Sequence, residues 1–465
     1  MKRNIFKLGI GLMGLLLLLI GYLAYLQVID NRAMLANPYN RRIPAKEALI
    51  HRGGIYDTKG VALAETRAVD GENQRVYPLG NSAAHLLGYR STLYGKVGLE
   101  AVYDPVLLGL EGSDRFRNTY YRLLGQDRQK GGDVVLTLDS SLQKLAEDLL
   151  GSRRGAVVLL DCRTGALRAA ASSPRYDPNN LDSDWSRLTQ NEAAPLLNRA
   201  FQGAYPPGSV FKLVTASGVL TASAQAATET FDCPGYFVVD GYTLTDSGTH
   251  GQVDLEKALA VSCNTAFAQL GLELGAEGLT RSFKAFGIDQ NPLADFVCRP
   301  GAMAPVHDMG ATELASCAIG QGELLVNPLS MALVAAAIAN QGTLMRPYLV
   351  EYLKDSTGAV TRTTTPSRWR NAVMPSIASQ LKEAMLEAVR SGTATGAAVS
   401  GVQVAGKTGS AQNPHGQSHA WFVGFAPAEQ PRLCIAVVVE NAGSGGAVAA
   451  PIAGRMFKEA FSQGY

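Results

Sequence analysis

Ser209 and Lys212 have residue types and a spacing that suit nucleophilic catalysis. Side chains three positions apart on a helix lie on one face, about one turn apart, so the lysine amine can reach the serine hydroxyl and activate it. The preceding segment 205–208, Tyr-Pro-Pro-Gly, predicts a helix that begins at the serine. There the unpaired N–H groups and the helix dipole favour developing negative charge. The pair therefore predicts a serine nucleophile with a lysine as its activating group.

The same spacing occurs at two other places, Ser141 with Lys144 and Ser379 with Lys382. The first pair lies in a segment that is typical of a helix start with an N-cap. The second lies in an amphipathic pattern over 377–385, which predicts a solvated Lys382. We interpret both pairs as scaffold, so the spacing alone does not select Ser209.

Two further motifs follow Ser209 and Lys212 in a fixed order. Ser262-Cys263-Asn264 is the only S-x-N in the chain, and Lys407-Thr408-Gly409 is the only K-[ST]-G and ends an apolar, strand-like run. Class A β-lactamases and penicillin-binding proteins carry this triple. One such motif can arise by chance, whereas the ordered set in suitable structural settings indicates serine acyl-transfer chemistry.

Beyond these motifs, the chain resembles class B penicillin-binding proteins of the penicillin-binding protein 2/FtsI-like group over nearly its full length. In the N-terminal region the resemblance is carried by 51–57 (HRGGIYD) and 97–104 (VGLEAVYD). In the C-terminal region it is carried by 171–179 (ASSPRYDPN), 319–322 (IGQG), 327–329 (NPL) and 420–427 (AWFVGFAP). The resemblance implies a membrane-anchored peptidoglycan D,D-transpeptidase that is acylated by β-lactams.

Acyl-transfer chemistry gives the first two motifs their roles. We expect Ser209 Oγ to attack the carbonyl between the two D-alanines of a stem peptide, releasing the last one and leaving an acyl-enzyme. The amine of a second peptide then attacks that ester. Lys212 is the expected base if its neighbours lower its pKa, and the group that takes the proton is disputed among these enzymes. Ser262 can relay a proton between Lys212 and the leaving amine.

The remaining motif residues are expected to bind substrate. Asn264 can both donate to and accept from a substrate amide. Lys407 and Thr408 offer a positive charge and a hydroxyl to the terminal carboxylate. Gly409 keeps the strand edge open for a peptide. The resemblance implies an oxyanion hole formed by the backbone N–H groups of the nucleophile and of Ser410.

Two residues depart from the family pattern. Ser410 stands where many relatives have threonine, and this exchange keeps the hydroxyl. Cys263 is an unusual middle residue for S-x-N. It is either a reactive thiol near the site or a packed neutral cysteine, and we expect the packed form.

The motifs need a fold that brings them together. Strand-like runs at 155–160 and 166–171 flank a turn, and three more follow at 402–407, 420–425 and 433–440. Helices are expected at 140–150 and 452–461, and the region from 208 to 345 is expected to be mostly helical. This order predicts an α+β fold with a five-stranded, mainly antiparallel sheet and helices on both faces. The resemblance identifies it as a penicillin-binding/serine β-lactamase-like transpeptidase domain.

The N-terminus sets the domain order. An uncharged apolar run, 9–26, follows Lys2, Arg3 and Lys7 and is long enough to span a bilayer. Basic residues before it predict a cytoplasmic N-terminus. The alternative, a cleaved signal peptide, lacks a small-x-small site after the run. We therefore expect a cytoplasmic tail at 1–7, a transmembrane anchor at 8–28, a pedestal or dimerisation-like domain at 29–135 and an extracytoplasmic transpeptidase domain at 136–465.

Charge and cysteine usage argue against other classes of protein. The net charge is +2 without a run of Lys and Arg, so we expect no nucleic-acid partner. The six cysteines are scattered, without a C-x-x-C pair or a Cys/His cluster at metal spacing, so we expect neither zinc nor a cofactor. His415 and His419 can line the cleft or serve the turn there. Asp246 and His250 gain no role from spacing alone.

Other functions share parts of this pattern. A serine β-lactamase must hydrolyse its acyl-enzyme, and the membrane anchor and large N-terminal domain argue against it. A D,D-carboxypeptidase, with water as acceptor, is the closest enzymatic alternative. A penicillin sensor normally needs a signalling module, whereas scaffolding for divisome or elongasome partners is compatible with catalysis. The resemblance implies that glycan chains come from a partner, a SEDS-type membrane glycosyltransferase (FtsW/RodA-like), within the cell-wall machinery.

Overall fold

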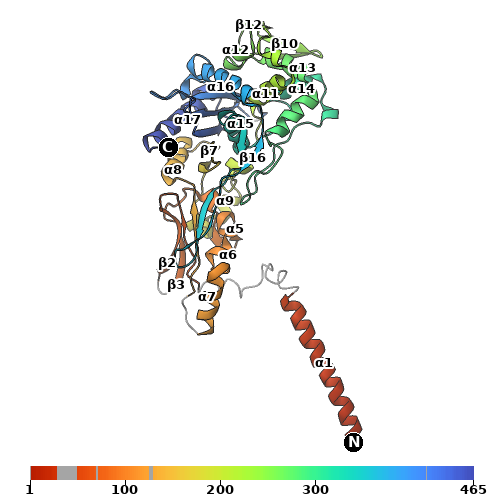
Figure 1. Cartoon of the computed structure of the whole chain (residues 1–465), viewed down its shortest axis with the longest axis vertical. Helices are drawn as coiled ribbons and strands as arrows, with labels where there is room; N and C mark the ends of the chain where they lie inside the picture. The colour runs from red at the N-terminus through yellow and green to blue at the C-terminus, as the bar shows by residue number, and fades with distance from the viewer. Residues whose placement is uncertain (1, 29–49, 70–71, 125–128, 415) are drawn as a thin grey trace.

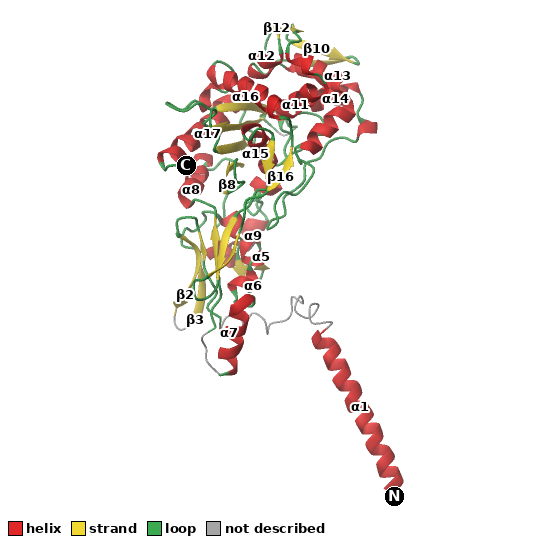
Figure 2. Ribbon diagram, in the orientation of Figure 1, coloured by secondary structure: helices red, strands yellow, loops and turns green. Residues whose placement is uncertain are grey.

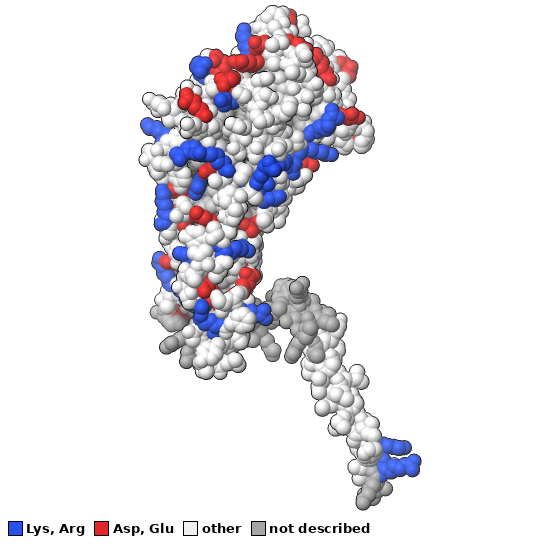
Figure 3. All heavy atoms as spheres, viewed as in Figure 1, with Lys and Arg blue, Asp and Glu red and all other residues white. Residues whose placement is uncertain are grey.

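The structure is a computed structural model that describes residues 2–28, 50–69, 72–124, 129–414 and 416–465. One apolar helix, α1 (Lys2–Val28), precedes a body with a slender N-terminal part and a broader C-terminal part (Figure 1). Within the described chain, α1 is the one helix that is long and apolar enough to cross a membrane, over Arg3–Leu23. Basic side chains gather at its N-terminal end, and the rest of its visible surface is uncharged (Figure 3).

The broader part is built on a five-stranded antiparallel sheet with the order β17-β18-β19-β7-β8. Its strands are β7 (Gly155–Asp161), β8 (Leu167–Ser173), β17 (Ala405–Ala411), β18 (His419–Ala426) and β19 (Leu433–Val439). The predicted early hairpin and three late strands are confirmed, because β19 pairs with β7 and joins the two groups into one sheet. The predicted α+β fold is confirmed with them.

Alternate residues of the central strands face different helices. Val157 and Leu159 of β7 belong to an apolar cluster with α8 (Ser140–Leu150) and α17 (Gly445–Ser462). Val158 of the same strand belongs to a second cluster, on the other face, with residues of α11 (Lys212–Ala222) and α15 (Pro328–Ala339). A strand covered on both faces has a continuous apolar sequence, and β19, with the sequence LCIAVVV, has one.

The chain between β8 and β17 supplies most helices of the broader part (Figure 2). These are α9 (Leu181–Thr189), α10 (Arg199–Gln202), α11, α12 (Leu255–Ala260), α13 (Asn264–Ala285), α14 (Ala311–Ala318), α15 and α16 (Pro375–Arg390). The prediction of a mostly helical region missed four short strands, which pair only in twos: β9 (Phe231–Cys233) with β12 (Gly251–Val253), and β10 (Tyr236–Val239) with β11 (Tyr242–Thr245). Runs this short carry too little alternation to be recognised in a sequence. A similar pair joins β13 (Thr343–Met345) to β16 (Arg368–Asn371).

The slender part, which we call the pedestal, is a second sheet with the order β15-β14-β6-β1-β2-β3. Four of its strands come from the N-terminal region: β1 (Ile55–Tyr56), β2 (Ala62–Val69), β3 (Glu72–Val76) and β6 (Asp133–Leu136). The other two, β14 (Val350–Lys354) and β15 (Val360–Thr363), come from much later in the chain. The pedestal also holds β4 (Arg90–Ser91), β5 (Gly95–Lys96), α4 (Ala84–Leu87), α5 (Gly98–Val102), α6 (Asp104–Leu107) and α7 (Gly112–Leu123).

A buried ionic network lies at the centre of the pedestal. Arg52 Nε and Arg75 Nε contact the two carboxylate oxygens of Glu100 at 2.8 and 2.6 Å. The two arginines outweigh the effect of burial and hold the pKa of the Glu100 carboxyl below its usual range. The network ties the segments before β1, in β3 and in α5 to one another.

The last helix begins earlier than its predicted start at 452. A Cβ on Gly445 would lie 2.3 Å from both the Gly409 and the Trp421 carbonyl oxygens. Glycine therefore lets the first turn of α17 approach the sheet closely. The last two residues of the glycine-rich stretch 441–446 form the start of this helix.

Candidate active site

Ser209 lies in a 3₁₀ turn, Gly208–Phe211, and the α-helix α11 begins only at Lys212. The α-helix therefore begins three residues later than expected, after a 3₁₀ turn that contains the serine. The three-residue spacing between Ser209 and Lys212 is kept. Gly208 has φ +56°, and a Cβ there would lie 3.0 Å from Ala411. The upstream glycine thus provides a backbone conformation and a close approach to β17 that other residues would strain.

Lys212 connects the first motif with the second. Its side chain is fully buried, and Nζ donates to Ser262 O at 2.7 Å, to Asn264 Oδ1 at 2.7 Å and to Ser262 Oγ at 3.4 Å. Within the described chain, Lys212 Nζ makes no hydrogen bond to Ser209 Oγ. Burial lowers the pKa of the Lys212 amine to about 8, although the nearby Asp246 carboxylate opposes the shift.

The second motif forms the N-terminal end of α13. Ser262 has φ +64°, in the left-handed region that residues with a side chain seldom adopt. Cys263 is the N-cap, and its Sγ accepts from Ala266 N at 3.3 Å. Asn264 Nδ2 donates to Thr245 O at 2.9 Å, so its amide is held on both sides. The strained serine and the fixed amide are positioned by this helix start.

The third motif lies on β17, and its residues differ in whether they reach the pocket. Thr408, Gly409 and Ser410 line a pocket with Ser209, whereas Lys407 is fully buried and its Nζ donates to Thr408 O at 2.9 Å. Burial, and then the nearby Lys212, lower the pKa of the Lys407 amine well below its usual range. Lys407 therefore lies beneath the pocket instead of in its wall.

One pocket of about 390 Å³ gathers residues of all three motifs. Its lining includes Ser209, Ser262, Asn264, Thr408, Gly409, Ser410, Asp246 and Thr393. A smaller pocket of about 110 Å³ shares Ser209 and adds Tyr242, Ile319 and Gln321. Ser141, Lys144, Ser379 and Lys382 line neither pocket, which agrees with their interpretation as scaffold.

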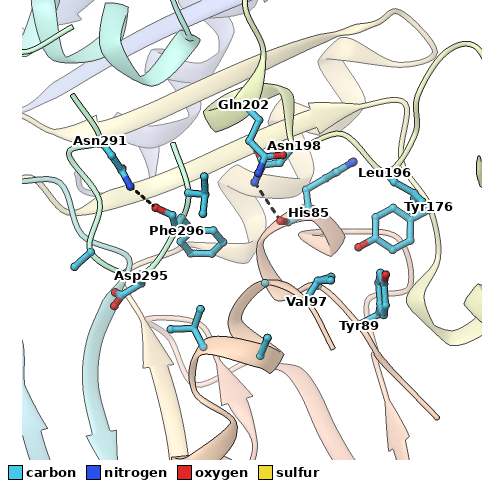
Figure 4. Close-up of a pocket in the computed structure, with 16 residues that line it drawn as sticks. His85, Tyr89, Val97, Tyr176, Leu196, Asn198, Gln202, Asn291, Asp295 and Phe296 are labelled. Atoms are coloured by element: carbon cyan, nitrogen blue, oxygen red, sulfur yellow. Dashed lines mark hydrogen bonds between the residues drawn. The ribbon is translucent and has the colours of Figure 1, made fainter. Parts of the chain in front are cut away.

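A larger pocket of about 550 Å³ lies between the pedestal and the broader part and contains none of the motif residues (Figure 4). His85, Tyr89 and Val97 line it from the pedestal, and Gln202 and Phe296 line it from the broader part. Burial lowers the pKa of His85 to about 4, and its Nε2 is hydrogen-bonded to Pro195 O. The histidine is thus a neutral structural group, and the lining of the pocket contains no serine, threonine, cysteine or lysine.

Asp246 is a site residue that the sequence did not reveal. Its Oδ2 accepts from Asn264 N at 2.6 Å and from Thr265 N at 2.9 Å, so it binds the N-terminus of α13. A carboxylate there also satisfies the positive end of the helix dipole. Its spacing to the second motif carries no signal, because the contact depends on the β10–β11 hairpin. His419 Nδ1 accepts from Asn441 N at 3.1 Å, and His415 lies outside the described residues.

Folding also brings together four side chains that could hold a metal ion: Cys233, Asp246, His250 and Cys263. Their donor atoms all lie within 4.8 Å of one another, and both thiols are buried. Two sulfurs, an imidazole and a carboxylate are ligands that tetrahedral zinc accepts. Spacing in the sequence does not reveal this cluster, since residues far apart in the chain meet here, and the expectation of no zinc stays a prediction.

Comparison with known proteins places this site in context. Residues 155–458 match the penicillin binding protein transpeptidase domain, and 52–134 match the penicillin binding protein A dimerisation domain. The chain is 37% identical to the peptidoglycan D,D-transpeptidase PbpA of Mycobacterium tuberculosis over the full length of both. It is 31% identical to the peptidoglycan D,D-transpeptidase MrdA of Acinetobacter baumannii, covering 82% of this chain and 65% of that one.

Solved structures show the same likeness. Penicillin-binding protein A of M. tuberculosis, as a ceftriaxone acyl-enzyme complex, superposes with a TM-score of 0.83 at 36% identity, covering 89% of this chain and 99% of that chain. Its penicillin G acyl-enzyme complex superposes with a TM-score of 0.81 at 36% identity, covering 89% and 100% of the two chains. These neighbours carry covalently bound β-lactams on the same fold.

Proposed function

This chain belongs to the class B penicillin-binding protein transpeptidases, and we propose that Ser209 is the nucleophile of its peptidoglycan D,D-transpeptidase reaction. The observation that carries the proposal is the pair of bonds from Lys212 Nζ to Ser262 and Asn264, which joins two motifs beside the Ser209 pocket. The acyl-enzyme complexes of the M. tuberculosis relative support a covalent serine mechanism in this family.

Acylation begins with the neutral Lys212 amine. With its pKa near 8, this amine takes the Ser209 proton as Oγ attacks the carbonyl between the two D-alanines. The backbone N–H groups of Ser209 and Ser410 stabilise the oxyanion. Ser262 passes the proton from Lys212 to the departing D-alanine amine, which matches its position within hydrogen-bond reach of Lys212 Nζ.

The substrate lies along β17. Asn264 binds the peptide amide, and the Thr408 hydroxyl binds the terminal carboxylate, while Gly409 leaves room for the backbone. Lys407 acts from beneath: a carboxylate at Thr408 favours the charged form of its desolvated amine, because an opposite charge nearby favours ionisation.

The amine of a second stem peptide then attacks the acyl-enzyme ester and forms the crosslink. A D,D-carboxypeptidase would use water at this step. A class A β-lactamase would use a glutamate-activated water. The E-x-x-x-N spacing typical of those enzymes occurs at Glu323 and Asn327, but Asn327 is the buried N-cap of α15 and neither residue lines the pockets of Ser209.

Labelling the purified chain with fluorescent penicillin tests the nucleophile. Ser209→Ala should abolish covalent labelling, whereas Ser141→Ala, at a matched serine outside the pocket, should leave it unchanged. Labelling that survives Ser209→Ala would refute the assignment. Incubating the unlabelled chain with a D-Ala-D-Ala donor peptide and acceptor amines then separates crosslinking from hydrolysis, because a transpeptidase transfers its acyl group to the amine.

We also propose that the chain is a single-pass membrane protein with a cytoplasmic tail at 1–7, an anchor at 8–28, a pedestal at 29–135 and a transpeptidase domain at 136–465 outside the cytoplasm. The apolar α1 and the basic residues at its N-terminal end support this arrangement (Figure 3). A C-terminal alkaline phosphatase fusion should be active in cells. An inactive fusion with intact expression would contradict the orientation.

A SEDS-type membrane glycosyltransferase (FtsW/RodA-like) is the proposed partner, since the matched parts of the chain are a transpeptidase domain and a dimerisation domain and a polymerase would have to supply the glycan chains. Such a partner should copurify with the full chain from detergent extracts. Loss of copurification on replacing α1 with an unrelated membrane helix would place the contact in the anchor.

A further inference from the structure

Three large apolar side chains of α7, and Leu124 directly after the helix, form an exposed stripe on the pedestal. Phe116 is 78% exposed, Tyr120 60%, Leu123 81% and Leu124 51%. Their spacing of i, i+4, i+7 and i+8 places them on one side of the helix. Exposing an apolar stripe of this kind to water is unfavourable, so a membrane or another surface that covers it would lower the free energy.

The opposite side of α7 is fixed to the pedestal. Asp114 is buried and accepts from Ser356 N at 2.9 Å and from Ser356 Oγ at 2.6 Å. Asn118 is buried as well and donates to Gly109 O at 3.1 Å and Lys130 O at 3.0 Å. These bonds fix the rotation of α7 about its axis, and as a result the apolar stripe faces away from the rest of the pedestal.

The stripe lies at the end of the pedestal where the chain arrives from α1. His51 N donates to Gln129 O, and Gly131 N donates to His51 O, both at 2.9 Å. His51, close to where the described chain resumes after α1, is therefore hydrogen-bonded to the stretch 129–131 that follows α7. In Figure 1 α7 forms the end of the pedestal that is remote from the transpeptidase domain.

The composition of α7 suits a membrane surface. The helix carries Arg115, Arg117 and Arg122 against the single acid Asp114. Arg115 flanks the apolar stripe on one side, where it can meet anionic headgroups. Arg117, on the other side, is paired with Asp114 at 2.8 Å and Asp355 at 3.7 Å within the pedestal. Phenylalanine and leucine can enter the acyl boundary, and tyrosine favours the headgroup level. The four side chains offer on the order of 500 Å², less than the about 800 Å² per partner that a stable protein interface buries.

We propose that α7 lies on the outer surface of the bilayer that α1 spans, with Phe116, Tyr120 and Leu123 at the boundary between headgroups and acyl chains. The inference rests on the membrane anchoring proposed above. A small apolar stripe is sufficient there, because α1 already holds the pedestal close to the bilayer and the contact is effectively intramolecular. The contact would orient the pedestal relative to the membrane.

Spin labels on the full chain in liposomes of phosphatidylcholine and phosphatidylglycerol test this position. The six native cysteines are buried, so a nitroxide can be attached selectively at Leu123→Cys, with the labelled wild-type chain as background. Val238→Cys, 52% exposed on β10 at the far end of the molecule, is the matched control. Arg115→Cys reports from the flank of α7. Fluorescent penicillin labelling verifies that each variant is folded.

The label at Leu123 should be several-fold more accessible to oxygen, relative to a water-soluble nickel chelate, than the label at Val238, and Arg115 should be intermediate. Equal nickel accessibility at Leu123 and Val238 would overturn the proposal. So would dipolar broadening between Leu123 labels, which would indicate a second copy of the chain, or a label shielded from both reagents, which would indicate a protein contact. Alkaline carbonate extraction separates a failure of the anchor, which releases the chain, from a failure of the α7 contact, which does not.

Discussion

The amine of the fully buried Lys212 and the side-chain carbonyl oxygen of Asn264, which lines the pocket, are joined by a 2.7 Å hydrogen bond. This bond therefore fixes the position of the proposed base, Lys212, relative to the proposed substrate-binding group, the Asn264 side-chain amide. Each constrains the other before substrate arrives, and a change in either should alter both binding and proton transfer.

The rate of Ser209 acylation by penicillin should rise with pH and level off above about 8. The pKa of Lys212 is lowered by burial, so its neutral form grows as pH rises through that value. At pH 7 about a tenth of the amine is neutral, so the plateau rate should be roughly tenfold higher. Stopped-flow measurements with fluorescent penicillin give the profile. A rate that stays flat or falls over this range contradicts Lys212 as the base.

Asn264→Asp should move that profile to higher pH. A carboxylate in place of the amide oxygen favours the charged form of Lys212 and raises its pKa by about 1–3 units. Acylation at neutral pH should fall correspondingly, with recovery in alkaline buffer. Asn413→Asp, in the loop after β17, provides the control substitution. Loss of acylation at every pH would instead show that the amide itself is indispensable.

Gly208→Ala should lower both stability and acylation. The left-handed backbone costs an alanine about 1–2 kcal/mol, and its Cβ would meet Ala411 at 3.0 Å. Gly310→Ala is the matched control, since a Cβ there has open space and an ordinary φ. Thermal unfolding and penicillin labelling should both separate the two variants. Equal behaviour would mean that the turn at Ser209 tolerates a side chain.

Glu100→Gln should destabilise the pedestal by about 3–5 kcal/mol, because Arg52 and Arg75 would keep buried charges without a partner. The lowered pKa of Glu100 also means that its contribution is present above the unfolded-state value and is lost as pH falls through the folded one. Urea unfolding at neutral and acidic pH measures both effects, with the exposed Glu111→Gln as control. A difference between variants that persists unchanged in acid would speak against the ion network.

Metal analysis of the protein purified without chelator tests the four-residue cluster, which would bind about one zinc ion per chain if it is a zinc site. Cys233→Ser should remove it, and chelation should lower the melting temperature, because the four donor residues connect β9 to the N-terminus of α13. Cys317→Ser, at a buried thiol outside the cluster, should retain the metal. Absence of metal together with two fewer titratable thiols would identify a Cys233–Cys263 disulfide instead.

Much of the site is local in sequence and was therefore predictable. Ser209, Ser262 and Lys407 were identified because each motif is only three or four residues long and occurs in the expected order. The two groups of strands were found because their apolar runs are long. What the sequence does not encode locally is that Lys407 lies under the pocket, since the depth of a side chain depends on how β17 packs against its neighbours.

Contacts made by distant residues were missed for the same reason. Asp246 binds the N-terminus of α13 from a loop whose strands are too short to recognise, and Cys233 lies 30 positions before Cys263. The 3₁₀ turn at Ser209 arises from the close contact between Gly208 and β17, which no helix signal predicts. Likewise, nothing in the sequence between 350 and 363 indicates that it completes a sheet begun near residue 55.

That long-range strand pairing has a consequence for how the protein is made. β14 and β15 enter the pedestal sheet beside β6 only after most of the transpeptidase domain has been synthesised. Until then the edge of β6 is open to other chains, a state that favours misassembly. The pedestal and the catalytic domain must therefore mature together, and a pedestal that holds all six strands shows that the chain has been synthesised past residue 363.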